Sequence, residues 1–224
     1  MTATIESYVT PFRLYRYRSM ENLEREINAI ERGYLHCSAF VDLNDPMEGL
    51  FSSSHQLRNK ARYRGIRNSI VSRKDETGIC SFSETYDHEL MWAHYANKFR
   101  GVCVAYSLSR LLKNLPRGVT FVRLYYNESV PTIRTANKQP GELAQMVLSY
   151  KNYRWIYERE WRMFAKLGNV SYGDANCVTR VYLGSRMEVE RRHEIIDRLK
   201  SLGIKTSEMA IDKYAISFEP TRRS

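Results

Sequence analysis

The sequence lacks any long apolar segment and any pattern typical of a secretory signal. It contains no run of about 18 apolar residues, the length that a transmembrane helix needs. Its first seven residues have neither a basic stretch nor an apolar one. With only 11 glycines and 6 prolines, it is also unlike collagen or a low-complexity chain. We therefore expect a cytoplasmic protein that makes no contact with membranes.

Metal-binding and common nucleotide-binding motifs are missing as well. The four cysteines are scattered and form no Cys-x-x-Cys pair, so we expect reduced thiols in the core. His88 and His94 are six residues apart, which places them about 120° apart around a helix, and no metal site is predicted. The absence of a P-loop, a Gly-x-Gly-x-x-Gly fingerprint and a Gly-x-Ser-x-Gly elbow disfavours nucleotide kinases, Rossmann dehydrogenases and common hydrolases.

Positive charge, by contrast, is abundant. The 35 Lys and Arg residues exceed the 25 Asp and Glu residues by 10, which favours partners that carry negative charge. Residues 58–74 contain seven basic residues and no acidic one. This segment is either a solvated helix face or a nucleic-acid contact whose affinity depends on salt.

Alternating and helical patterns predict a single α+β domain over residues 12–218, with residues 1–11 and 219–224 as terminal tails. We expect a mixed, mostly antiparallel sheet with flanking helices. The predicted strands are 12–18, 34–37, 79–83, 102–106, 119–126, 161–167, 180–183, 204–209 and 214–218. The predicted helices are 22–30, 58–74, 87–96, 108–115, 141–153 and 188–202, and residues 38–49 form a turn-rich loop.

Three polar clusters lie on predicted strands, where a core pattern would not place them. They are Arg16 with Arg18, Ser81 with Ser83, and Glu158 with Glu160. In each cluster the residues are two apart, so their side chains share one face of a strand. We interpret the three pairs as parts of one site across neighbouring strands. The alternative, which has similar weight, is an ion-pair network that only stabilises the fold.

The order arginine, Ser-x-Ser, Glu-x-Glu resembles the signature of ADP-ribosyltransferases that use NAD. The resemblance implies that Arg16, Ser81 and Ser83 bind NAD and that Glu160 is the essential carboxylate. A carboxylate stabilises the positive charge that develops on the ribose when nicotinamide leaves. Glu158 would then orient or deprotonate an acceptor, which is a protein or a nucleic acid.

Two further groups are weaker candidates. His94 would contact the same cleft if its helix faces it. Asn44, Asp45 and Glu48 would form a substrate-binding loop, although Asn-Asp-Pro is above all a turn sequence.

Several phrases in order along residues 12–166 also resemble a bacterial family of unknown function, DUF2971. They are Leu14-Tyr-Arg-Tyr-Arg-Ser, Asn44-Asp-Pro-Met-Glu, Cys80-Ser-Phe-Ser-Glu, Met91-Trp-Ala-His-Tyr-Ala, Gly101-Val-Cys-Val and Trp155-Ile-Tyr-Glu-Arg-Glu-Trp-Arg. This family implies no activity. Two hypotheses therefore stand: an NAD-dependent ADP-ribosyltransferase, for example a toxin or defence effector, and a non-catalytic or nucleolytic nucleic-acid-binding module.

Overall fold

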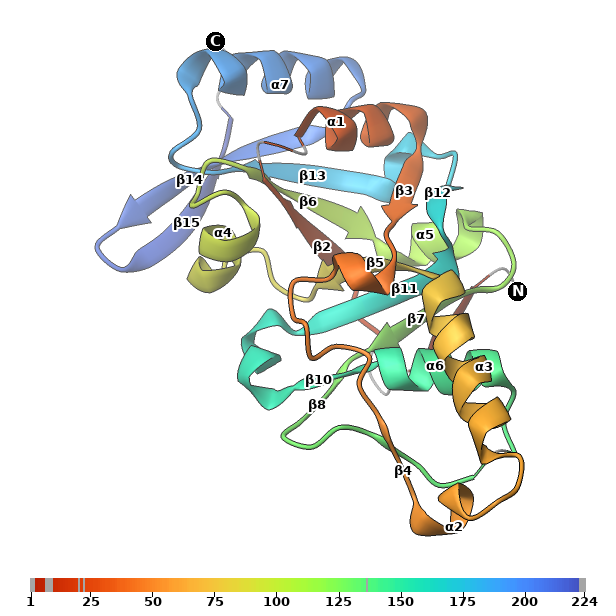
Figure 1. The fold of residues 1–224 in the computed structure, drawn as a ribbon. Helices are drawn as coiled ribbons and strands as arrows, with labels where there is room; N and C mark the ends of the chain where they lie inside the picture. The colour runs from red at the N-terminus through yellow and green to blue at the C-terminus, as the bar shows by residue number, and fades with distance from the viewer. Residues whose placement is uncertain (1–2, 7–9, 20, 22, 136, 222–224) are drawn as a thin grey trace.

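A nine-stranded sheet with the order β1-β7-β11-β5-β2-β6-β13-β14-β15 forms the centre of the fold (Figure 1). This computed structural model describes residues 3–6, 10–19, 21, 23–135 and 137–221. The pairs β1–β7 and β13–β14 are parallel and the other neighbours are antiparallel, so the predicted α+β sheet is confirmed. The strands are β1 (Ala3–Glu6), β2 (Arg13–Arg18), β5 (Thr77–Ser83), β6 (Val102–Ser107), β7 (Val119–Arg123), β11 (Glu160–Lys166), β13 (Val178–Leu183), β14 (Lys205–Asp212) and β15 (Ala215–Pro220).

Three pairs of short strands and a set of helices surround this sheet. The pairs are β3 (Tyr34–Cys37) with β12 (Gly168–Ser171), β4 (Ser52–Ser53) with β9 (Thr132–Ile133), and β8 (Tyr125–Asn127) with β10 (Tyr150–Asn152). The α-helices are α1 (Leu23–Arg32), α2 (His55–Arg58), α3 (Tyr63–Glu76), α4 (Glu89–Tyr95), α5 (Leu108–Asn114), α6 (Pro140–Leu148) and α7 (Val189–Ser201). The 3-10 helices are η2 (Phe40–Asp42), η3 (Tyr153–Glu158) and η4 (Ala175–Cys177). Among the described residues, no helix is both long and apolar enough to cross a membrane.

Strands β2 and β5 meet at a seam in the sheet. They share one register pair, Tyr15 with Ser83. Along the rest of its length β2 pairs with β6, and β5 pairs with β11. The two halves of the sheet therefore diverge beyond Tyr15, and the space between them is open to side chains from both strands.

The core forms on both faces of the sheet because side chains alternate along β2. Leu14 points into the main core, which also contains Leu23 and Ile27 of α1. Tyr15 and Tyr17 point to the opposite face, where they join a second cluster with residues of α4. Each fully buried Leu or Ile stabilises the fold by about 1.5–3 kcal/mol. Figure 1 shows α1 and α7 side by side over the sheet.

The two ends of the domain differ from the prediction. Residues 3–6, predicted as part of a tail, form β1 and pair in parallel with β7. At the other end, β15 continues to Pro220, two residues beyond the predicted domain limit. Helix α1 covers most of the predicted helix 22–30, although Asn22 itself lies outside the described residues.

Two predicted elements are interrupted near the site. The strand predicted over 119–126 breaks at Leu124, because the Leu124 N–H donates to the Glu160 carbonyl (3.0 Å) and the next N–H, of Tyr125, donates to the Ser149 carbonyl (2.8 Å). The helix predicted over 141–153 ends at Leu148 and is followed by β10. These two breaks bring β8 and β10 together beside β11.

Candidate functional site

A cavity of about 210 Å³ lies at the seam and contains members of all three predicted polar clusters. Arg16, Ser81, Ser83, Glu158 and Glu160 line it. Because Tyr15 pairs with Ser83, Arg16 points to the opposite face of the sheet from Ser83. Consecutive residues of β2 nevertheless line the cavity, from Tyr15 to Arg18. Residues on both faces of the sheet therefore line one cavity, and the open seam is what makes this possible.

Arg16 is the buried cation on the β2 side of the cavity. Its side chain is 5% exposed, and Nη1 lies 3.7 Å from Glu26 Oε1. Glu26 is held more closely by Arg18, whose Nε lies 2.9 Å away. Nη1 of Arg16 has no hydrogen-bond acceptor in the described part of the chain. Arg16 is therefore a buried cation whose ion pair with Glu26 is longer than a hydrogen bond.

Ser83 holds the carboxylate segment in place. Its hydroxyl donates to the Glu158 carbonyl at 2.7 Å and accepts from the Thr85 N–H at 3.1 Å. Between Glu158 and Glu160, Arg159 has the left-handed conformation (φ 44°), which ends η3 and starts β11. Ser83 therefore positions the Glu-x-Glu turn, whereas the half-buried Ser81 lines the cavity beside Arg162, its partner across the strands.

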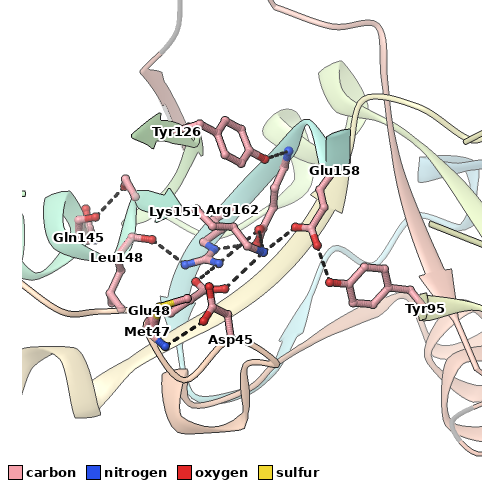
Figure 2. A network of polar contacts seen from close by, with 12 residues as sticks. Asp45, Met47, Glu48, Tyr95, Tyr126, Gln145, Leu148, Lys151, Glu158 and Arg162 are labelled. Atoms are coloured by element: carbon pink, nitrogen blue, oxygen red, sulfur yellow. Dashed lines mark hydrogen bonds and ion pairs between the residues drawn. The ribbon is translucent and has the colours of Figure 1, made fainter. Parts of the chain in front are cut away.

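Glu160 lies in a buried ion-pair network, and Figure 2 labels its partners Lys151 and Arg162. Its Oε1 accepts from Arg162 Nε at 2.7 Å, and its Oε2 accepts from Lys151 Nζ at 2.8 Å. Arg162 also donates to Glu48 and to the Leu148 carbonyl. Although burial alone would raise it, the charges of Arg162 and Lys151 hold the pKa of Glu160 well below its ordinary value. Glu160 is therefore a permanent negative charge at neutral pH.

Glu158 has a different electrostatic environment, although it is only two residues away. Its Oε2 accepts from Lys151 Nζ at 2.5 Å, and its Oε1 accepts from the Tyr95 hydroxyl. Burial raises the pKa of Glu158 above its ordinary value, and the Glu160 charge adds to this, whereas Lys151 and Tyr95 act against it. Two neighbouring carboxyl groups whose pKa values are shifted in opposite directions suit an acid–base role and a charge-stabilising role.

Three members of the network were not predicted as site residues: Tyr95, Lys151 and Arg162. Arg162 had a signal in the sequence, because it is two residues after Glu160 and so shares a strand face with it. No pattern in the sequence indicated Lys151, because its position depends on where α6 ends and on the fold of η3. The predicted ion-pair alternative is thus present in the structure, but its cations are Lys151 and Arg162 rather than the arginines of β2.

The remaining candidate residues do not all line the same cavity. Asn44 and Glu48 line the cavity, whereas Asp45 lines a second cavity beside it. His94 is exposed and is not among the lining residues. Met91 and Tyr95, four residues apart on α4, face the cavity instead. His94 is about 100° around the helix from Tyr95 and points away, so its predicted contact with the cleft is wrong.

Comparisons with known proteins identify a family over part of the chain. No curated protein and no solved structure matches the sequence. Residues 91–163 match the model of a family described as protein of unknown function, DUF2971. This segment runs from α4 to the middle of β11 and includes Tyr95, Lys151 and both glutamates of the site. The predicted family is thereby confirmed for this segment: residues 91–163 are a match to DUF2971.

Proposed function

We propose that the protein is an NAD-dependent ADP-ribosyltransferase and that the seam cavity binds NAD. One observation carries the proposal. The arginine and Ser-x-Ser clusters lie on the adjacent strands β2 and β5, Glu160 begins the next strand β11, Glu158 ends η3, and all of them line one cavity. Nη1 of Arg16 lies 3.7 Å from Glu26 but has no hydrogen-bond acceptor among the described residues, and it would donate to a phosphate or ribose oxygen of the substrate. Tyr15, Tyr17 and Phe82 also line the cavity and offer aromatic surfaces to the rings of NAD.

The two carboxyl groups would have separate tasks in this reaction. The bond between nicotinamide and ribose C1′ breaks, and nicotinamide leaves with the electron pair. The anionic Glu160 stabilises the positive charge that develops on the ribose. The acceptor nucleophile then forms a bond to C1′, and its proton passes to Glu158. Burial raises the pKa of Glu158, which makes it the better base of the two.

The decisive experiment measures nicotinamide release from NAD by the wild type, Glu160→Gln and Glu158→Gln. Loss of transition-state electrostatics of about 3 kcal/mol corresponds to about a hundredfold or more in rate, so we expect at least this loss for Glu160→Gln. Because Glu160 also pairs with Lys151 and Arg162, each variant is assayed below its own melting temperature.

Glu84→Gln is the matched control, since Glu84 follows Ser83 directly but pairs with Arg123 and Trp161 outside the cavity. We expect Glu84→Gln to retain its turnover. A folded wild type that neither binds nor cleaves NAD would contradict the proposal. Full activity of folded Glu160→Gln would remove Glu160 from the catalytic step.

Nucleic-acid binding is the second candidate, and the basic segment favours it. Arg62, Arg64 and Arg67 of this segment are all exposed. Exchange of these three for Glu should weaken RNA or DNA binding and flatten its salt dependence. No retention of nucleic acid by the wild type at low salt would leave this face as a solvated surface only.

A further inference from the structure

A second cavity, of about 130 Å³, lies next to the seam cavity. Glu48 and Lys151 line both cavities, and their side chains form an ion pair of 3.3 Å between Oε1 and Nζ. The other walls come from residues 45–50, 127–131 and 150–152. The proposed transferase reaction assigns no role to this space.

Asp45 is the unusual residue of the second cavity. It is 5% exposed. Its Oδ1 accepts from the Met47 N–H at 2.9 Å, whereas its Oδ2 is buried and has no hydrogen-bond partner within the described ranges. Lys151 and Arg162 are engaged by the three glutamates of the network, and Lys74 donates to the Gly49 carbonyl. A buried carboxylate oxygen without a donor is costly, so this oxygen is a ready acceptor for a ligand that brings one.

The surroundings of Asp45 carry excess negative charge. Around the second cavity and in the adjoining network, Asp45, Glu48, Glu128, Glu158 and Glu160 contribute five formal negative charges, and Lys74, Lys151 and Arg162 contribute three positive ones, which leaves two negative charges. The protein as a whole has a formal charge of +10. Figure 2 shows Asp45 beside the ion-pair network. A local excess of this sign attracts a cation.

The hydrogen-bond acceptors and the apolar residues of the second cavity indicate which kind of cation it would bind. Asn127 Oδ1 accepts from the Ser129 N–H (3.3 Å) and Asn152 Oδ1 accepts from the Arg154 N–H (3.0 Å), so each amide oxygen retains a second lone pair. With Asp45 Oδ2 they offer three acceptors, the number of N–H donors on an ammonium group. Met47, Leu50 and Val130 also line the cavity and are about half exposed, which suits a chain of methylene groups.

We propose that the second cavity binds a primary alkylammonium group. Two sources share this chemistry: the side chain of a lysine on a protein, and a free polyamine. The ammonium would donate to Asp45 and to the two asparagine amides, and its alkyl chain would leave past Met47 and Leu50. The proposal stands apart from the transferase reaction, because it involves neither NAD nor a chemical step.

The test is a calorimetric titration of the full chain with spermidine and, separately, with Nα-acetyl-lysine methylamide. Butanol serves as the uncharged probe. Asp45→Asn keeps an acceptor for the Met47 N–H but removes the charge at Oδ2, so the loop should retain its shape. Asp42→Asn removes the same charge from an exposed residue of the preceding turn, which lines the seam cavity instead. Leu50→Lys is a second variant, which would place the protein's own ammonium group at the opening of the second cavity.

We expect saturable binding of at least one amine and none of butanol. Asp45→Asn should weaken the binding about tenfold or more, the size of a lost charge-assisted hydrogen bond, while Asp42→Asn leaves it unchanged. Leu50→Lys should compete and weaken it as well. Tighter binding of the lysine derivative would identify a protein partner, and tighter binding of spermidine a polyamine. Binding of neither amine, or equal binding by wild type, Asp45→Asn and Leu50→Lys, would overturn the proposal. The outcome is independent of NAD turnover.

Discussion

Glu158 and Glu160 share one ammonium group: Lys151 Nζ lies 2.5 Å from Glu158 Oε2 and 2.8 Å from Glu160 Oε2. The two carboxylates nevertheless differ, because Glu160 also faces Arg162 whereas Glu158 faces the Tyr95 hydroxyl. A charged guanidinium stabilises an ionised carboxylate far more strongly than a neutral phenol does. The single cation therefore couples an anion that stays charged to a neighbour that titrates more easily.

The first prediction concerns Lys151 itself. Lys151→Met keeps most of the side-chain volume but leaves Glu48 and Glu160 with Arg162 alone, and leaves Glu158 with no cation in the described network. Removal of one partner from a buried ion pair costs about 3–5 kcal/mol, so the free energy of unfolding should fall by that amount. Urea unfolding followed by circular dichroism measures it. A loss below about 1 kcal/mol would show that the network does not stabilise the fold.

The second prediction concerns the pH dependence of stability. Burial acts to raise the pKa of Glu160, but Arg162 and Lys151 lower it below the unfolded value of about 4.3. A lowered folded-state pKa contributes stability that is present above the unfolded pKa and is lost as pH falls through the folded pKa. The difference in unfolding free energy between wild type and Glu160→Gln should therefore be largest near pH 7 and shrink below about pH 4. A difference that is constant from pH 7 to pH 3 would contradict this.

Strong local patterns made most of the sheet predictable. The segments 79–83 and 102–106 are strands because both are largely buried within the sheet and bear β-branched and aromatic residues. The break at Leu124 was not predictable. It arises from hydrogen bonds to Glu160 and Ser149, which are distant in sequence, and no local pattern encodes them.

Part of the site was also predictable from local patterns in the sequence. The residue types and their order suggested that Arg16, Ser83 and Glu160 would line one cavity, and they do. The seam was not predictable, because it depends on how far β2 and β5 remain paired beyond Tyr15. The position of Lys151 depends in turn on the end of α6, and α6 ends at Leu148 in a segment whose local pattern is still helical.

The third prediction concerns the packing of the half-sheet that contains β2. A Cβ at Gly101 would lie 2.0 Å from the backbone oxygen of Arg18, so Gly101→Ala forces two backbone segments apart. We expect a loss of about 3 kcal/mol or more in unfolding free energy. At Gly65 in α3, an added Cβ meets nothing within 4 Å, and Gly65→Ala should stabilise the helix by about 0.5–1 kcal/mol. Melting temperatures of the two variants should thus shift in opposite directions, and a shift in the same direction would count against this packing.

The last prediction separates Tyr95 from the other buried tyrosines. The Tyr95 hydroxyl donates to Glu158, and this hydrogen bond lowers the pKa of that carboxyl. Tyr95→Phe should therefore raise the pKa of Glu158 further. If ionised Glu158 is the base, the acidic limb of the pH profile of NAD turnover should move to higher pH, while the plateau rate stays nearly constant. A ¹³C NMR titration of the Glu158 carboxyl carbon measures the same shift without any assay of activity.

Tyr172→Phe is the matched control for this experiment. The Tyr172 hydroxyl is also buried, but it has no hydrogen-bond partner among the residues that the structure describes, and it is not among the residues that line the seam cavity. Its removal deletes one oxygen and no bond, so neither the Glu158 titration nor the pH profile should change. If the Glu158 carboxyl titrates identically in wild type, Tyr95→Phe and Tyr172→Phe, the hydrogen bond from Tyr95 does not tune Glu158, and burial, Lys151 and Glu160 set its pKa instead.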